Sequence, residues 1–147
     1  MTGPVAPPQH LGRNRVGSTV RHITIDCAAP HEPYDLALFW SRVLELPLGP
    51  DDFPGDPEAA VITGDGRPML LFVRVPDAKA GKNRVHLDLE PDTTREQELE
   101  RILALGATVV ADMRKPDGRG WVVCADPAGN EFCIEASKSD RTTAQST

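Results

Sequence analysis

The chain has 147 residues, a length that suits one ordinary domain with enough buried surface for a hydrophobic core. Its 22 acidic and 16 basic residues give a net charge of −6. An acidic chain repels phosphate backbones, so the composition disfavours nucleic-acid binding and suits a neutral or cationic small ligand better. Since the three cysteines are scattered and form no CxxC pair, we expect a reducing, cytoplasmic location and no disulfide framework.

The two ends of the chain differ in composition from its middle. Residues 1–18 are rich in proline and glycine and contain no apolar run, which predicts a disordered tail that is neither a signal peptide nor a membrane span. Residues 137–147 are polar throughout and predict a loose C-terminal tail. The folded domain is therefore expected over residues 19–136, with no contact to a membrane.

A short pattern occurs twice along the chain. Residues 20–26 and 84–90 each place a histidine third, followed by apolar, polar, apolar and acidic residues. A second match follows in the same order, because residues 42–46 resemble residues 101–105. Two matches in one order indicate an internal duplication.

Each copy shows the same succession of predicted elements. Strict alternation predicts opening strands over 20–27 and 84–90. Apolar residues at spacings of three and four then predict one helix per copy, ending near Pro47 and Gly106. Three further strands are predicted in each copy: near 48–51, 59–63 and 69–75 in the first, and near 108–113, 121–125 and 131–136 in the second. The prediction is an α+β fold of two βαβββ modules, about 19–76 and about 83–136.

Residues 126–130, Asp-Pro-Ala-Gly-Asn, form a turn signal before the final strand. This turn, the paired βαβββ layout and the two strand histidines together resemble the glyoxalase/bleomycin-resistance/extradiol dioxygenase (vicinal oxygen chelate) superfamily, and more narrowly its glyoxalase-like domain proteins. The resemblance covers roughly residues 19–136. It implies two modules with pseudo-twofold symmetry, mixed sheets curled around a cavity, and helices on the outside. It also implies pairing of modules within one chain or in a homodimer, and the sequence leaves both open.

The resemblance further implies a divalent metal held by a histidine from each opening strand and a carboxylate from the last strand. His22 and His86 match the histidines, Cys133 stands at the carboxylate position, and residues 71–72 offer no fourth ligand. A metal here would be zinc, nickel, iron or manganese, and a metal-free cavity is the alternative. Glu135 lies on the same strand face as Cys133 and is a candidate base or displaced ligand.

Alternation along the strands supports a shared polar face without the resemblance. It places His22, His86, Cys133 and Glu135 opposite apolar residues that helices would cover. An antiparallel sheet with a solvated face carries polar residues for solubility alone, so the pattern also has a purely structural explanation. Two aromatic residues are candidate ligand contacts: Trp121 at the mouth of a pocket and Phe53 in a proline-rich loop.

These observations favour two functions for a protein that acts on or binds a small organic molecule. One is a metal-assisted lyase or isomerase of the glyoxalase type, acting on an oxygen-rich substrate. The other is a metal-free protein that binds an aromatic or cationic compound, as bleomycin-resistance proteins do. The aromatic content of 5% counts mildly against the second. An accessory domain without chemistry is a third interpretation.

Overall fold

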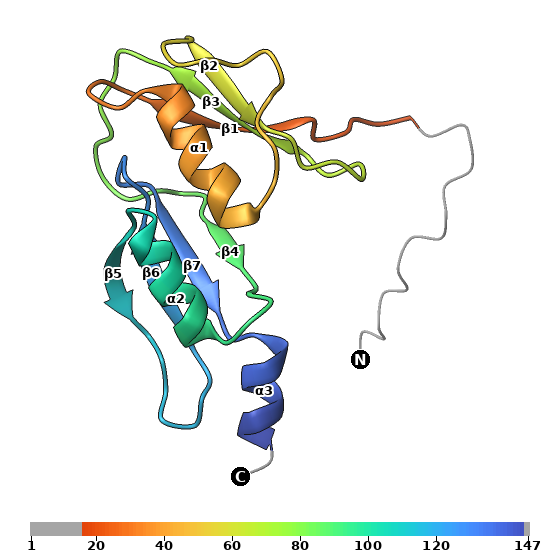
Figure 1. Ribbon diagram of the computed structural model, residues 1–147, viewed down its shortest axis with the longest axis vertical. Coiled ribbons are helices and arrows are strands. Elements are labelled where there is room, and N and C mark those ends of the chain that lie inside the picture. The colour runs from red at the N-terminus through yellow and green to blue at the C-terminus, as the bar shows by residue number, and fades with distance from the viewer. Residues whose placement is uncertain (1–15, 146–147) are drawn as a thin grey trace, which may run out of the picture.

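A computed structural model of the chain describes residues 16–145 (Figure 1). The elements in chain order are β1 His22–Cys27, α1 Pro33–Leu44, β2 Glu58–Val61, β3 Met69–Arg74, β4 Leu87–Leu89, α2 Arg95–Ala104, β5 Thr108–Asp112, β6 Trp121–Ala125, β7 Glu131–Glu135 and α3 Lys138–Gln145. None of the helices described is long and apolar enough to cross a membrane. The predicted tail over residues 1–18 falls mostly on residues 1–15, outside the described part of the chain.

The strands form two mixed sheets with the same plan. The first has the order β1-β3-β2, with β1 parallel to β3 and β2 antiparallel to it. The second has the order β4-β7-β6-β5, with β4 parallel to β7 and the other pairs antiparallel. We call β1–β3 with α1 the first module and β4–β7 with α2 the second module. Figure 1 shows the modules one above the other, with α1 and α2 on the same side. The predicted α+β fold with two mixed sheets is confirmed.

Two predicted strands differ from the structure. The strand expected over residues 48–51 is reduced to one isolated bridge between Leu48 and Val61. Pro50 has no backbone N–H to donate, and the side chain of Asp52 accepts the N–H of Ala60 at 2.8 Å in place of a further strand partner. The opening strand of the second module is also shorter than predicted, because β4 begins at Leu87.

The C-terminal segment was expected to be loose, and instead it forms α3. A capping arrangement explains the helix, because the Ser137 hydroxyl accepts the N–H of Asp140 at 3.1 Å while the Asp140 carboxylate accepts the N–H of Ser137 at 2.8 Å. The same carboxylate accepts the N–H of Arg95 at 2.9 Å, so α3 is tied to the start of α2.

One apolar core extends through both modules. The ring of Trp40 on α1 lies 4.9 Å from that of Phe132 on β7, in an edge-to-face arrangement. Trp40 Nε1 also donates to Asp126 Oδ2 at 3.0 Å, and the guanidinium of Arg101 donates to the carbonyl oxygens of Arg42 and Val43 at the end of α1. These contacts hold the modules side by side and fix the space between them.

Candidate metal and ligand site

The sheet face of the second module that points away from α2 carries most of the predicted site. On β7, Phe132 and Ile134 are fully buried, so alternation places Cys133 and Glu135 on the opposite face. The strand register then sets their neighbours: Asp88 lies opposite Cys133, and Trp121 lies opposite Glu135. The parallel pairing of β4 with β7 therefore brings the polar residues of two distant segments together.

Three potential metal ligands meet on this face. His86 Nδ1 lies 3.0 Å from Asp88 Oδ1, and ligand atoms of His86, Asp88 and Cys133 all lie within 4.8 Å of one another. We call these three residues the metal cluster. The contact orients the imidazole against the carboxylate, and either ring nitrogen offers a metal ligand, depending on the tautomer. The histidine and aspartate are exposed, and Cys133 is 8% exposed.

The thiol of the metal cluster has a perturbed acidity. Burial raises the pKa of Cys133, and the adjacent Asp88 raises it further through its negative charge and its hydrogen bond. The thiol therefore keeps its proton at neutral pH when no cation is near. A bound divalent cation reverses this balance, because it favours the thiolate and offsets the carboxylate charge.

The donor set fits a zinc-type ion. Zinc takes imidazole nitrogen, thiolate sulfur and carboxylate oxygen at about 2.0–2.3 Å, in a tetrahedral arrangement whose fourth position stays open in catalytic sites. Ligand atoms around such an ion are separated by about 3.3–3.8 Å, so donors already within 4.8 Å need only small side-chain rotations. The thiol favours zinc over harder ions such as magnesium.

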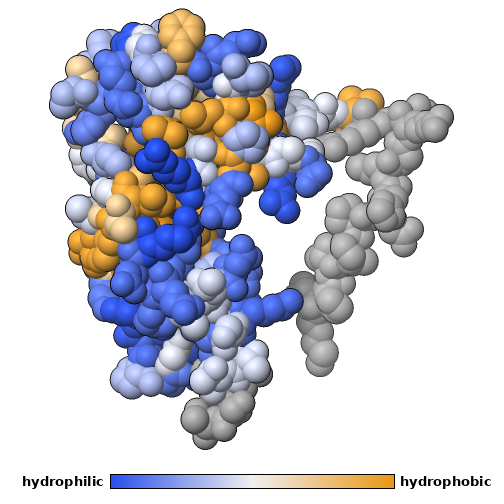
Figure 2. Space-filling model, viewed as in Figure 1, coloured by the Kyte–Doolittle hydropathy of each residue, from blue (hydrophilic) through white to orange (hydrophobic). Residues whose placement is uncertain are grey.

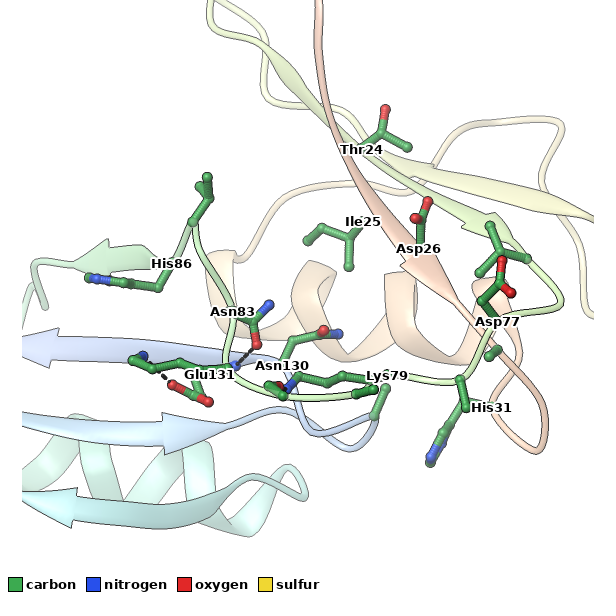
Figure 3. A pocket seen from close by; sticks show the side chains of 18 of the residues that line it. Thr24, Ile25, Asp26, His31, Asp77, Lys79, Asn83, His86, Asn130 and Glu131 are labelled. Atoms are coloured by element: carbon green, nitrogen blue, oxygen red, sulfur yellow. Dashed lines mark hydrogen bonds and ion pairs between the residues drawn. The ribbon is translucent and has the colours of Figure 1, made fainter.

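The metal cluster lines a hollow of about 380 Å³, together with Trp121 and Glu135. A second hollow of about 620 Å³, the inter-module cleft, lies between β1, the linker over residues 75–86 and the start of β7 (Figure 3). Three residues line both hollows: Lys82, His86 and Glu131. These three residues therefore form a wall that the two hollows share.

The structure brings together some of the predicted site residues and separates others. His86, Cys133, Glu135 and Trp121 share the smaller hollow. His22 lies in register with Met69 of the first module and is not part of the metal cluster. Phe53 is 60% exposed and lines neither hollow.

The sequence analysis missed Asp88 as a candidate metal ligand and Lys82 as part of the candidate site. The signal for Asp88 was present, because a residue two positions beyond His86 on an extended strand lies on the same face. Lys82 gave no such signal. It lies in the linker, and its ammonium donates to Glu131 Oε2 at 2.5 Å. This contact joins segments that are distant in the sequence, so no local pattern predicts it.

Comparisons with known proteins agree with this architecture. Residues 22–135 match a family model described as a glyoxalase-like domain. A glyoxalase/bleomycin resistance protein/dioxygenase family enzyme from Burkholderia phytofirmans PsJN is 18% identical, with a TM-score of 0.61 over 80% of this chain and 97% of its own. At such identities, structural likeness shows the fold alone. A comparison with curated proteins finds no match.

Two further solved structures resemble the chain. A fosfomycin resistance protein, FosX, from Listeria monocytogenes was solved with Mn(II) and 1S,2S-dihydroxypropylphosphonic acid; it is 16% identical, with a TM-score of 0.60 over 90% of this chain and 100% of its own. Lactoylglutathione lyase from Agrobacterium tumefaciens is 20% identical, with a TM-score of 0.55 over 84% of this chain and 96% of its own.

Proposed function

The chain belongs to the glyoxalase-like domain family, and from that premise we propose that it is a metal-assisted lyase or isomerase for a small oxygen-rich molecule. The metal would be zinc, held by His86, Asp88 and Cys133. One observation carries the proposal: nitrogen, oxygen and sulfur ligand atoms of these residues lie within 4.8 Å of one another on one sheet face.

The residues around the metal cluster have separate roles in this proposal. When bound, the ion acts as a Lewis acid toward a substrate carbonyl or a pair of adjacent oxygens. Glu135 follows Cys133 on the same face of β7 and is exposed, so its carboxylate is free to take and return a substrate proton. Trp121 lies opposite Glu135 and is 42% exposed, which leaves part of its ring for contact with the substrate.

The structure solved with Mn(II) and a dihydroxypropylphosphonic acid supports this proposal, since a protein of the same fold holds a metal and an oxygen-rich small molecule. That ligand and that metal belong to the other protein. For this chain the donor set itself selects the metal, because a thiol ligand favours zinc.

Two matched substitutions test the metal ligands. Asp88→Asn removes a ligand, and Asp92→Asn makes the same change four residues away at an exposed position outside the cluster. After zinc loading and dialysis, elemental analysis should find about one zinc per chain in the unaltered protein and in Asp92→Asn. In Asp88→Asn the zinc affinity should fall at least about tenfold. Equal zinc in both variants would remove Asp88 from the metal cluster.

Glu135→Gln tests the catalytic role apart from metal binding. The variant should retain its zinc and lose about 10²- to 10⁴-fold in turnover of a hemithioacetal, diketone or diol substrate, because an amide cannot take up the proton. Full turnover in Glu135→Gln would assign the proton transfer to another group.

One observation favours the second candidate function, a metal-free binding protein. The inter-module cleft is large enough for a drug-sized ligand on its own. Protein that holds no zinc after loading but binds a small molecule in the cleft would select this function. The choice between pairing within one chain and a homodimer stays open to sedimentation analysis, and the cytoplasmic location stays a prediction.

A further inference from the structure

The C-terminal helix α3 lies at the end of the second module, shortly after the strand that carries Glu135. Figure 1 shows it below the ends of β4 and β7. Over residues 138–143, the side chain of Asp140 is half-buried and the others are exposed. An isolated helix of eight residues is unstable in water. Polar contacts with the domain therefore decide whether α3 forms.

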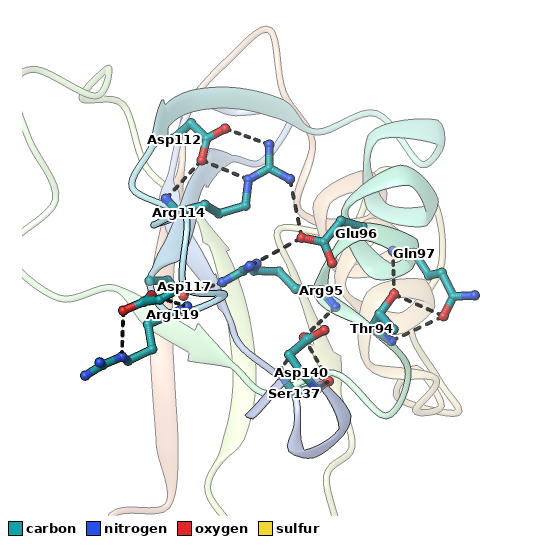
Figure 4. A network of polar contacts seen from close by, with 11 residues as sticks. Thr94, Arg95, Glu96, Gln97, Asp112, Arg114, Asp117, Arg119, Ser137 and Asp140 are labelled. Carbon is teal, nitrogen blue, oxygen red and sulfur yellow. Dashed lines mark hydrogen bonds and ion pairs between the residues drawn. The ribbon is translucent and has the colours of Figure 1, made fainter. Parts of the chain in front are cut away.

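Asp140 joins the first turn of α3 to the start of α2. Its Oδ2 atom accepts hydrogen bonds from the backbone N–H of Arg95 at 2.9 Å and from the backbone N–H and hydroxyl of Ser137, both at 2.8 Å. Figure 4 shows Asp140 and Ser137 beside Arg95. Hydrogen bonds to an ionised oxygen are about twice as strong as those between neutral groups. The charge of Asp140 therefore fixes where α3 begins.

Arg141 joins the two strands whose pairing stops just before Glu135. The ladder between β4 and β7 ends at Ile134, so Glu135 has a strand partner only on the β6 side. Beyond the ladder, the Arg141 guanidinium donates to the carbonyl oxygen of Ala136 at 2.7 Å and to the Glu90 carboxylate at 2.6 Å. Ala136 follows β7 and Glu90 follows β4. Arg141 therefore connects the strand ends where backbone pairing is absent.

We propose that α3 is a releasable strap that holds Glu135 in place beside the metal cluster, with Asp140 and Arg141 as positioning residues. When α3 is docked, the end of β7 is linked to β4 and to the start of α2. The pair of Arg141 with Glu90 is exposed, and exposed ion pairs contribute little to stability, so α3 can open while the domain stays folded. Opening frees the end of β7 and makes Glu135 mobile. The catalytic role of Glu135 rests on the proposed function, whereas the docking of α3 does not.

Two matched double variants of the full chain test the strap by amide hydrogen exchange and NMR relaxation. Asp140→Asn/Arg141→Gln removes both contacts of α3. Asp92→Asn/Arg119→Gln makes the same two changes at exposed positions outside α3 and keeps the same net charge. The control should match the unaltered protein in every measurement.

The unaltered protein should show an opening of α3 that leaves the core folded. Amides of residues 140–145 should exchange at least about 100-fold faster than those of Phe132 and Ile134, which are fully buried. In Asp140→Asn/Arg141→Gln the remaining protection of residues 140–145 should be lost, while Phe132 and Ile134 stay protected. The backbone order parameter of Glu135 should fall from about 0.85 to below about 0.6.

Three results would overturn the strap. Equal protection of α3 and the core in the unaltered protein would make them one cooperative unit. Retained protection of α3 in Asp140→Asn/Arg141→Gln would mean that other contacts hold the helix. A rigid Glu135 beside an open α3 would show that the helix does not position it.

Turnover separates this inference from the proposed function. Asp140→Asn/Arg141→Gln leaves the metal cluster intact, so it should keep about one zinc per chain and its KM, while kcat falls about tenfold because Glu135 is no longer held in position. An unchanged kcat with a mobile Glu135 would refute the positioning role. If Glu135→Gln itself keeps full turnover, the proposed base is wrong, and exchange and relaxation still decide whether α3 is a strap.

Discussion

The two modules share one fold and differ in what they expose. In the first module, α1 buries a broad apolar face that includes Leu36, Phe39 and Trp40, whereas α2 buries only Arg95 and Ile102. The outer surface differs as well: Figure 2 shows hydrophobic residues on the upper, first module and at the junction, while the lower module is mostly hydrophilic. The first module therefore supplies most of the shared core, and the second carries the candidate metal ligands.

The exposed sheet faces differ at equivalent positions. The first module pairs Thr24 with Leu71 where the second pairs Asp88 with Cys133, in the same parallel register. His22 therefore has no ligand-forming neighbours equivalent to those of His86. Since burial of the apolar strand face determines the fold, the opposite face is free to change without loss of structure. A repeat of this kind conserves architecture more strictly than it conserves chemistry.

Introducing the two ligand types that the first module lacks around His22 gives the strongest test of this comparison. Thr24→Asp/Leu71→Cys places the three ligand types of the metal cluster around His22, in the register seen around His86. Zinc bound per chain, measured by elemental analysis, should rise from about one to about two. Unchanged zinc content in the folded variant would mean that features beyond these two positions distinguish the modules.

The turns before the last strand of each module give a matched stability test. The buried carboxylate of Asp126 accepts hydrogen bonds from Trp40 Nε1, from Asn130 Nδ2 and from the backbone N–H groups of Ala128 and Asn130. In the first module, Asp65 occupies an exposed turn with a left-handed backbone that asparagine also tolerates. Asp126→Asn should lower the free energy of unfolding by about 2–3 kcal/mol, because an amide donor then faces donors in a buried site.

Asp65→Asn should leave the free energy of unfolding unchanged within about 0.5 kcal/mol. Denaturant unfolding followed by tryptophan fluorescence measures both variants. Equal effects would show that the link between Trp40 and Asp126 does not hold the modules together.

The smallest expected effect lies in the β5–β6 hairpin of the second module (Figure 4). Side-chain and backbone hydrogen bonds from Arg114 lower the pKa of Asp112 from 3.8 to about 2. Because the folded-state pKa is lowered, this contribution to stability is full above pH 3.8 and is lost as the pH falls through about 2. Carboxyl titration by NMR should find a midpoint near 2 in the unaltered protein and a return toward 3.8 in Arg114→Gln. A midpoint near 3.8 in both would contradict the pairing.

The sequence predicted the repeated architecture well, because strand alternation and helix spacing are local signals. The prediction failed where tertiary contacts decide the outcome. The strand near residues 48–51 is reduced to a bridge because an aspartate side chain accepts the N–H of Ala60. The helix α3 forms because Asp140 caps both its own start and that of α2, a contact between residues 45 positions apart.

The candidate site was only partly predictable for the same reason. Alternation placed His86 and Cys133 on a polar face, and the structure brings them together through the pairing of β4 with β7. The histidine repeat made His22 seem equivalent to His86, but the residue two positions further along differs, Thr24 against Asp88. The residue on the paired strand differs too, Leu71 against Cys133. Periodicity in one strand does not report the residues opposite it.

The central claim is that metal binding depends on the second module alone, and zinc titration of His86→Ala beside His22→Ala tests it most directly. We predict that His86→Ala lowers the zinc affinity by at least about 100-fold, because it removes one of three ligands, while His22→Ala stays within about twofold of the unaltered protein. An equal loss in both variants would contradict the account and make His22 a ligand of the same ion.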